Sequence, residues 1–337
     1  MRMQRYKRWL LLSTLLGGCS TDVELVSRAA RERIVVYGIL RTDQEVQYIR
    51  IGKLFVTQED AAAYAARTDL SVLAEVTLSD GQQIWRAIPE TVEKIPSQPF
   101  YPFHVVYRLP MRPTPRKTYT LYVHVPHDTL LNVFAQTTVP SPPYIAKPET
   151  TILIGNQYAY PSIDLRKKYA IQFFPQLNSQ LPSLAGGYEL GFSFYYGEVV
   201  GQDTFWHTLR IGPRRIAPTS NVLLQTYTLQ EKELLSTAYA NLNNPGAKYI
   251  YDNNRLSKAW TLYLTALDTA LYNYLRVNDP ATTDFTTVKP EYTNIRGGLG
   301  VFGSAAVAYR HFRIDSCSEY LLRLNDTPAP MGPCSLE

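Results

Sequence analysis

Short stretches that alternate between apolar and polar residues run through positions 33–140. In Thr118–Val125, for example, Tyr119, Leu121 and Val123 fall on one face, and Val46–Val56 has the same period of two. This pattern is typical of half-buried strands. Further stretches of this kind are 33–40, 70–78, 83–88 and 103–109, and an Ala-rich run at 59–66 predicts one or two helical turns. The spacing predicts an immunoglobulin-like or fibronectin-like β-sandwich over 33–140.

A Pro-rich segment at 141–150 follows, and we place a domain boundary in this stiff, extended linker. For 151–337 we predict an α+β domain with two helices packed on a sheet, so the whole chain is mainly β with some α. Its clearest strands are Tyr169–Phe174 and Tyr188–Tyr196. The capping-box pattern at Thr228–Glu231 predicts the first helix, which has an apolar stripe of Leu234, Leu235, Ala238 and Leu242. A second helix is predicted from Leu256 to Arg276, where apolar residues recur at helical spacing: Leu256, Trp260, Tyr263, Leu264, Leu267, Leu271 and Tyr274.

The N-terminus has the pattern of a secretory signal. Four basic residues, Arg2, Arg5, Lys7 and Arg8, precede an apolar run of eight residues, Trp9–Leu16. A run of this length is too short to span a bilayer, which takes about 20 residues. Leu16-Gly-Gly-Cys19 is similar to the bacterial lipobox, which implies that residues 1–18 are a lipoprotein signal peptide and that Cys19 is acylated. The alternative is an ordinary signal with a chance cysteine.

Positions 19–32 are expected to form a tether between the lipid and the first domain. Its acidic, polar start at Ser20–Glu24 also resembles the surface-export signal of Bacteroidota lipoproteins. The chain as a whole carries 34 basic and 29 acidic residues, a net charge of +5. Removing the four basic residues of the signal from the 34 leaves 30 basic against 29 acidic residues. The basic character therefore belongs to the export signal, and we expect no nucleic-acid partner.

The segment Tyr292–Ser304 carries a family resemblance. It contains Asn294, Gly298, Gly300, Phe302 and Gly303 in the string Tyr-Thr-Asn-Ile-Arg-Gly-Gly-Leu-Gly-Val-Phe-Gly-Ser. The string resembles the C-terminal signature of a Bacteroidota lipoprotein family known as domain of unknown function 4249. The preceding Leu271-Tyr-Asn-Tyr-Leu275 fits as well. The resemblance implies an outer-membrane lipoprotein encoded beside TonB-dependent receptors, with no catalytic residues to carry over.

The same segment contains a literal G-x-G-x-x-G, Gly298 to Gly303. A dinucleotide site needs this pattern after a buried parallel strand early in a βαβ unit, and here it follows polar residues near the end of the chain. We expect instead that its glycines allow close approach of the backbone to a neighbour. His124 and His127 form the one cluster of histidines, too few to hold a metal on their own. No nucleophile elbow is present. We therefore expect no enzyme activity, no cofactor and no metal.

Cys317 and Cys334 remain in the mature chain. An even pair in an oxidising compartment predicts a disulfide, and two free thiols are the alternative. Tyr and Phe cluster in three segments, 99–103, 188–196 and 260–274, where they could fill a core or form a contact surface for sugar or peptide.

The resulting functional hypothesis is a lipid-anchored, non-enzymatic outer-membrane lipoprotein that faces either the periplasm or the cell surface. We expect a binding or accessory subunit of a TonB-dependent β-barrel receptor in nutrient uptake, with an unknown ligand. The alternative is a structural or adhesive surface protein without a role in transport.

Overall fold

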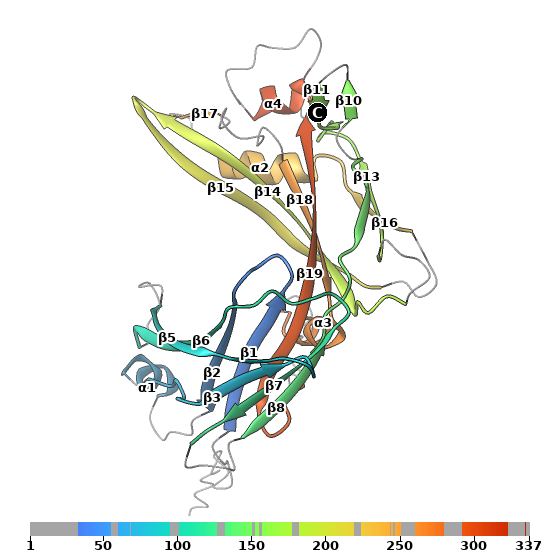
Figure 1. Cartoon of the computed structure of the whole chain (residues 1–337). Coiled ribbons are helices and arrows are strands. Elements are labelled where there is room, and N and C mark those ends of the chain that lie inside the picture. Colours follow the sequence, from blue (N-terminus) through green and yellow to red (C-terminus); the bar gives the residue numbers. More distant parts are fainter. Residues whose placement is uncertain are drawn as a thin grey trace, which may run out of the picture.

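The chain is mainly β, with several sheets and a few short helices (Figure 1). The computed structural model describes residues 33–54, 60–67, 69–94, 101–126, 132–149, 152–154, 157–176, 182–218, 224–242, 244, 247–250, 260–279, 292–322 and 334. The predicted signal peptide, Cys19 and the tether at 19–32 lie outside this part of the chain. In the part that is described, no helix is long and apolar enough to cross a bilayer.

One long sheet runs through the whole molecule. Its strand order is β15-β14-β18-β19-β1-β2-β6-β5. The central strand β19, Leu299–Ile314, pairs in parallel with β1, Arg33–Arg41, along its first half. Along its second half it pairs antiparallel with β18, Trp260–Leu267. The last strand of the chain thus belongs to both the lower and the upper part of the molecule (Figure 1).

The lower part encloses the first hydrophobic core between two sheets. One side is the long sheet, with β2 (Gln47–Leu54), β6 (Phe103–Leu109) and β5 (Ile88–Glu93). The other side is a four-stranded sheet of order β4-β3-β7-β8, with bounds Ile84–Arg86, Glu75–Ser79, Thr118–His124 and Val133–Thr138. Buried side chains from both sheets meet there, among them Ile34, Val36, Leu78, Tyr107, Tyr119, Leu121 and Phe302.

Most of the strands expected in 33–140 are confirmed, together with the helix in the Ala-rich run, which is α1, Ala61–Arg67. Tyr119, Leu121, Val123 and Val125 are all buried, as their alternation predicted. The structure adds one strand that no local pattern predicted. Phe302 of β19, near the far end of the sequence, packs into this core.

The upper part packs one face of the long sheet against helices and a smaller sheet. Its long hairpin is β14, Gly187–Val200, with β15, Asp203–Ile216. The smaller sheet has the order β16-β13-β9, with bounds Gln225–Leu229, Tyr169–Phe174 and Tyr144–Lys147. The remaining elements are α2 (Glu233–Leu242), α3 (Thr269–Val277), α4 (Ser316–Leu321), β10 (Ile152–Ile154), β11 (Gln157–Ala159), β12 (Ser162–Ile163) and β17 (Lys248–Ile250). The core of this part includes Tyr188, Phe192, Phe194, Leu235, Trp260, Leu262 and Phe312.

The predicted helix over Leu256–Arg276 is wrong over 260–267, and its start at 256–259 lies outside the described residues. Residues 260–267 form strand β18, in which Trp260, Leu262, Leu264 and Ala266 are buried on one face. The apolar residues of this segment fit both a helical and an alternating period, and pairing with β14 and β19 selects the strand. A helix begins only at Thr269, after Asp268.

The start of the first helix also differs from the prediction. Thr228 lies in β16 and pairs with Ala170, so it does not cap a helix. Helix α2 begins at Glu233, whose side chain accepts a hydrogen bond of 2.8 Å from the amide of Gln230. The apolar stripe is confirmed, since Leu234, Leu235, Ala238 and Leu242 are buried. Within the predicted linker, Tyr144–Lys147 form strand β9, which pairs with β13. The domain boundary placed there remains a prediction.

Candidate functional site

The signature segment, 292–304, includes the start of β19, the strand that lies between β1 and β18. Asn294 holds the strand by its side chain, which donates to the carbonyl of Phe302 at 2.7 Å and accepts from its amide at 3.0 Å. Phe302 itself is fully buried in the lower core. Asn294 and Phe302 therefore fix the position of β19.

Gly300 lies where β19 approaches β1 most closely. Its φ is +98°, and a Cβ atom there would lie 2.0 Å from the carbonyl oxygen of Val36. Gly298 approaches the carbonyl of Ile34, and Gly303 is covered by Leu271 of α3. The glycines thus have the role of close backbone approach that we expected. Gly300 and Gly303 lie within strand β19, where a dinucleotide fingerprint would open a helix.

A small buried polar cluster lies beside these glycines, where the two parts meet. The hydroxyl of Thr137 in β8 donates to Asp268 at 2.5 Å and lies 2.7 Å from the hydroxyl of Ser304 in β19. Asp268 caps α3 by accepting from the amide of Leu271 at 2.8 Å. The three side chains come from three elements and are all buried. They connect the four-stranded sheet, through β8, with the central strand β19 and with helix α3.

Burial raises the pKa of Asp268, against the opposing effect of its hydrogen bonds from Thr137, Leu271 and Ser304. The carboxyl is enclosed and its partners are internal, so the cluster does not present a reactive group to solvent. The sequence carried a usable signal for it, because Asp before Thr-Ala-Leu is a typical N-cap. Sequence reasoning missed Asp268 because the helix was expected to start upstream.

The opposite face of the long sheet in the upper part carries partly exposed aromatic side chains. Strand alternation divides the predicted Tyr188–Tyr196 cluster, since Tyr188, Phe192, Phe194 and Tyr196 enter the core while Tyr195 lies on the other face. Tyr195 stacks on Trp206 of β15 with ring centroids 5.3 Å apart. Trp206 is 43% exposed, so this stacked pair is accessible to a partner.

A second aromatic pair continues this face toward the junction. Tyr263 of β18 and Tyr309 of β19 are register partners, with ring centroids 5.3 Å apart. The hydroxyl of Tyr263 is bonded to Ser193 at 2.7 Å, and that of Tyr309 donates to Asp43 at 2.7 Å. Burial and this bond to Asp43 raise the pKa of Tyr309. We call Tyr195, Trp206, Tyr263 and Tyr309 the aromatic face.

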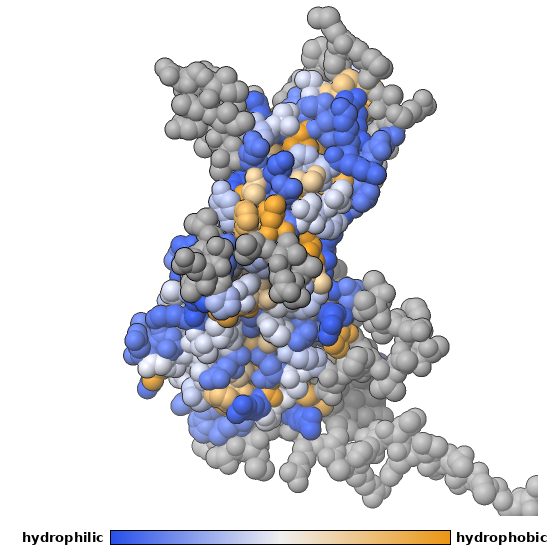
Figure 2. Space-filling model, turned by 90° about the vertical axis from the view of Figure 1, so that its right-hand side faces the viewer, coloured by the Kyte–Doolittle hydropathy of each residue, from blue (hydrophilic) through white to orange (hydrophobic). Residues whose placement is uncertain are grey.

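A cavity of about 400 Å³ lies at the end of the aromatic face, beside Asp43 and Tyr309. The segment that follows β6 also lines it, with Arg112, Pro113, Thr114 and Pro115, and the remaining lining residues are Thr42, Pro142 and Val307. Burial alone would raise the pKa of Asp43, but hydrogen bonds from Arg41 and Tyr309 hold it below its usual value. In the space-filling view, hydrophobic side chains gather at the middle of the molecule, between its two parts (Figure 2).

The histidines in the described residues have local partners or are isolated. His124 lies 2.9 Å from the side chain of Asn132, and His311 lies 3.0 Å from Thr261. His207 approaches Glu198 at 3.6 Å. Across these same residues no group of three or more His, Cys, Asp and Glu side chains has metal-binding geometry. His127 lies outside the described part of the chain.

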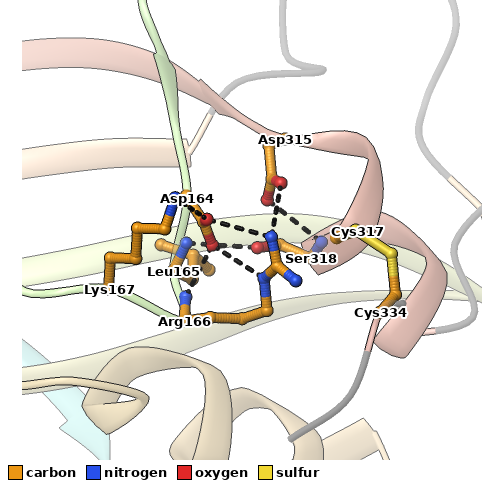
Figure 3. Close-up of a disulfide and its surroundings, with 8 residues drawn as sticks. All are labelled: Asp164, Leu165, Arg166, Lys167, Asp315, Cys317, Ser318 and Cys334. Atoms are coloured by element: carbon orange, nitrogen blue, oxygen red, sulfur yellow. Dashed lines mark hydrogen bonds and ion pairs between the residues drawn. A yellow bond between two sulfur atoms is a disulfide. The ribbon is translucent and has the colours of Figure 1, made fainter. Parts of the chain in front are cut away.

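Cys317 and Cys334 are joined by a disulfide, with their Cα atoms 5.3 Å apart (Figure 3). Cys317 belongs to α4. In the same helix, the hydroxyl of Ser318 accepts a hydrogen bond of 3.1 Å from the amide of Leu165. Arg166 pairs with Asp164 at 2.9 Å and approaches Asp315 at 3.6 Å. The disulfide therefore ties the end of the chain to a helix that is itself attached to the upper part.

We expect Cys317→Ser to lower the unfolding free energy by about 3 kcal/mol, because the disulfide closes a loop with a sequence separation of 17. Urea unfolding of the wild type and the variant measures the loss, and dithiothreitol should lower the wild-type midpoint to that of the variant. A mass measurement without reduction that finds two free thiols in the C-terminal peptide would contradict the disulfide.

The chain matches the family described as "Domain of unknown function (DUF4249)" over residues 20–311. No curated protein matches it. Among solved structures, one titled "Cytokine receptor complex - Crystal form 1A" is 10% identical, with a TM-score of 0.20, over 81% of this chain and 94% of that chain. That likeness is too weak to support an argument. The match over 20–311 spans most of the chain and includes the signature segment, so the protein belongs to the DUF4249 family.

Proposed function

We propose that this protein is a lipid-anchored outer-membrane lipoprotein and a non-enzymatic binding or accessory subunit of a TonB-dependent receptor. The observation that carries the binding role is the aromatic face, whose Trp206 and Tyr309 are each 43% exposed. Tyr and Trp are enriched in protein interfaces because one side of the ring can be buried while the polar group stays hydrogen-bonded. In the same proposal, the lower part is an immunoglobulin-like or fibronectin-like sandwich that supports this surface.

The lipobox Leu16–Cys19 supports the anchoring. Several acyl chains on one cysteine give stable attachment, at about 0.8 kcal/mol for each buried CH₂ group. We expect Cys19→Ser to abolish acylation and move the protein from the membrane to the soluble fraction. Membrane fractionation and the mass of the N-terminal peptide measure this. An unmodified Cys19 at the start of a membrane-bound wild-type protein would overturn the anchoring.

A pull-down from native membranes in mild detergent tests the accessory role, with a C-terminally tagged chain as bait. The expected result is recovery of a TonB-dependent β-barrel, and loss of that barrel with the double variant Trp206→Ser/Tyr309→Ser. The matched control is Tyr122→Ser, because Tyr122 is 48% exposed but lies in β7 of the other sheet. Recovery of the lipoprotein alone, under conditions that preserve other receptor complexes, would contradict the accessory role. Normal uptake with altered surface attachment in a deletion strain would favour the adhesive alternative.

A further inference from the structure

Strand β19 has an open stretch on one of its two edges. The edge that faces β18 is paired from Ala305 to Phe312. On the other edge, β1 ends its pairing at Ala305, and β12 begins its own at Arg313. Two strands that both run parallel to β19 therefore flank a gap on the same side of it.

Two hydrogen bonds at the ends of the gap identify the backbone groups that point into it. The amide of Val307 donates to the hydroxyl of Thr42 at 3.3 Å, and that of Arg313 donates to the carbonyl of Pro161 at 2.8 Å. Alternate residues of a strand direct their amide and carbonyl groups to the same edge. Tyr309 and His311 therefore also direct their amides toward the gap. Within the described part of the chain, no strand pairs with these two residues on this edge.

The surroundings of the gap leave room for an added chain. The cavity of about 400 Å³ begins at Thr42, Val307 and Tyr309, at one end of the gap. At the other end the ring of Tyr160 lies against His311, with centroids 5.7 Å apart. The cavity is also lined by Pro113 and Pro115, which have no amide hydrogen and cannot donate to a carbonyl of β19. The edge of β19 thus presents evenly spaced backbone donors and acceptors beside this cavity.

We propose that this gap binds an extended polypeptide segment of a partner protein by strand addition to β19 between Val307 and His311. Such a segment would continue the line of β1 and β12, with main-chain hydrogen bonds to Tyr309 and His311. The stretch from Val307 to His311 is about 13 Å long, enough for a short strand. Side chains on one face of the added strand would meet Tyr309 and Asp43. This inference deepens the proposed binding role, because it names the class of partner segment, but its test needs no receptor.

The edge strand β15 is a less suitable template. β15 lies at the end of the long sheet and is interrupted by Gly212 and Pro213, where its register with β14 shifts. It also carries the charged residues Arg210, Arg214 and Arg215. Proline, irregular register and charge are features that prevent pairing at exposed edges. The stretch at Tyr309–His311 contains no proline and keeps a regular register with β18, and its one arginine, Arg310, is bonded to the carbonyl of Ile145. Partner strands bound it at both ends.

Ten-residue peptides of random sequence, displayed on phage and selected on the full chain in mild detergent, serve as the probe. We expect the selected peptides to slow hydrogen exchange of the amides of Tyr309 and His311 at least tenfold. The amides of Ala308 and Arg310, which face β18, serve as internal controls and should not change. His311→Pro should weaken peptide binding at least tenfold, because it removes a donor on the open edge and leaves the β18 ladder intact.

The exchange measurement on the wild-type chain decides the proposal even if His311→Pro fails to fold. Peptides that protect other amides, such as those of β15, would overturn it, and so would a selection that enriches no peptide. These outcomes are independent of the membrane pull-down. A receptor recovered there with no peptide bound at the gap would uphold the accessory role and reject strand addition.

Discussion

Gly300→Ala is expected to lower the free energy of unfolding by more than about 3 kcal/mol, at the large end of single substitutions. Two effects add at this position. The backbone has φ of +98°, which disfavours a side chain, and the new Cβ would lie 2.0 Å from the carbonyl oxygen of Val36. That carbonyl belongs to β1, which cannot move without disturbing the lower core.

Gly81→Ala is the matched control. Gly81 also has a positive φ, +87°, but nothing lies within 4 Å of its Cβ position. It should therefore lose about 1 kcal/mol, the cost of the backbone conformation alone. Urea unfolding followed by tryptophan fluorescence measures both variants. Equal losses at the two positions would show that the close approach of β1 and β19 contributes nothing.

The strands of 33–140 could be predicted because each is a local pattern. Alternation in Thr118–Val125 is visible within eight residues, and every one of its predicted core positions is buried. The same local reasoning failed at Trp260–Leu267, where the apolar residues suit two periods and only pairing with β14 and β19 selects the strand. The predicted helix placed Tyr263 on its buried apolar face, whereas in strand β18 this side chain faces away from the core.

The pairing of β1 with β19 could not be predicted, because it joins Val36 to Gly300 across most of the chain and leaves no local period. The glycines of the signature indicated that the backbone lies close to a neighbouring segment, but they did not indicate that this segment is β1. A contact surface was one of two interpretations of the Tyr clusters, and Trp206 and Tyr309 belong to none of those clusters. Its position depends on which residues of β14, β18 and β19 share a face, and that follows from their register.

Asp268 should make the stability of this protein fall as pH rises. Burial raises the pKa of its carboxyl in the folded state above its ordinary value of about 3.9. The folded state then holds a proton that the unfolded state has already released. The stabilising contribution is complete below about pH 3.9 and is lost as pH rises through the folded pKa. The decline therefore begins on the acid side of neutrality.

Asp268→Asn isolates this effect, because the amide can accept from the amide of Leu271 and donate to the hydroxyl of Thr137 but cannot ionise. The unfolding free energy of the wild type minus that of this variant, measured by urea titration between pH 4.5 and pH 8, should decrease with pH. Burial also raises the pKa of the neighbouring Tyr292 above 10, outside this window. Other shifted carboxyls, such as Asp43 and Glu189, are common to both proteins and cancel in the difference. A difference that does not change with pH would contradict the burial of an ionisable group.

Asp268→Ala measures how much the polar cluster of Thr137, Asp268 and Ser304 contributes to stability by connecting the two parts of the molecule. The substitution leaves the amide of Leu271 and the hydroxyl of Thr137 without their acceptor, in a site enclosed by β8, β19 and α3. We expect a loss of about 2–4 kcal/mol, the sum of a lost helix cap and an unsatisfied buried donor. Asp315→Ala is the control, because Asp315 caps α4 in the same manner through the amide of Ser318 but is partly exposed. It should lose about 1 kcal/mol. If the two losses are equal, Asp268 acts only as a helix cap, and its bond to Thr137 adds nothing to the connection between the two parts of the molecule.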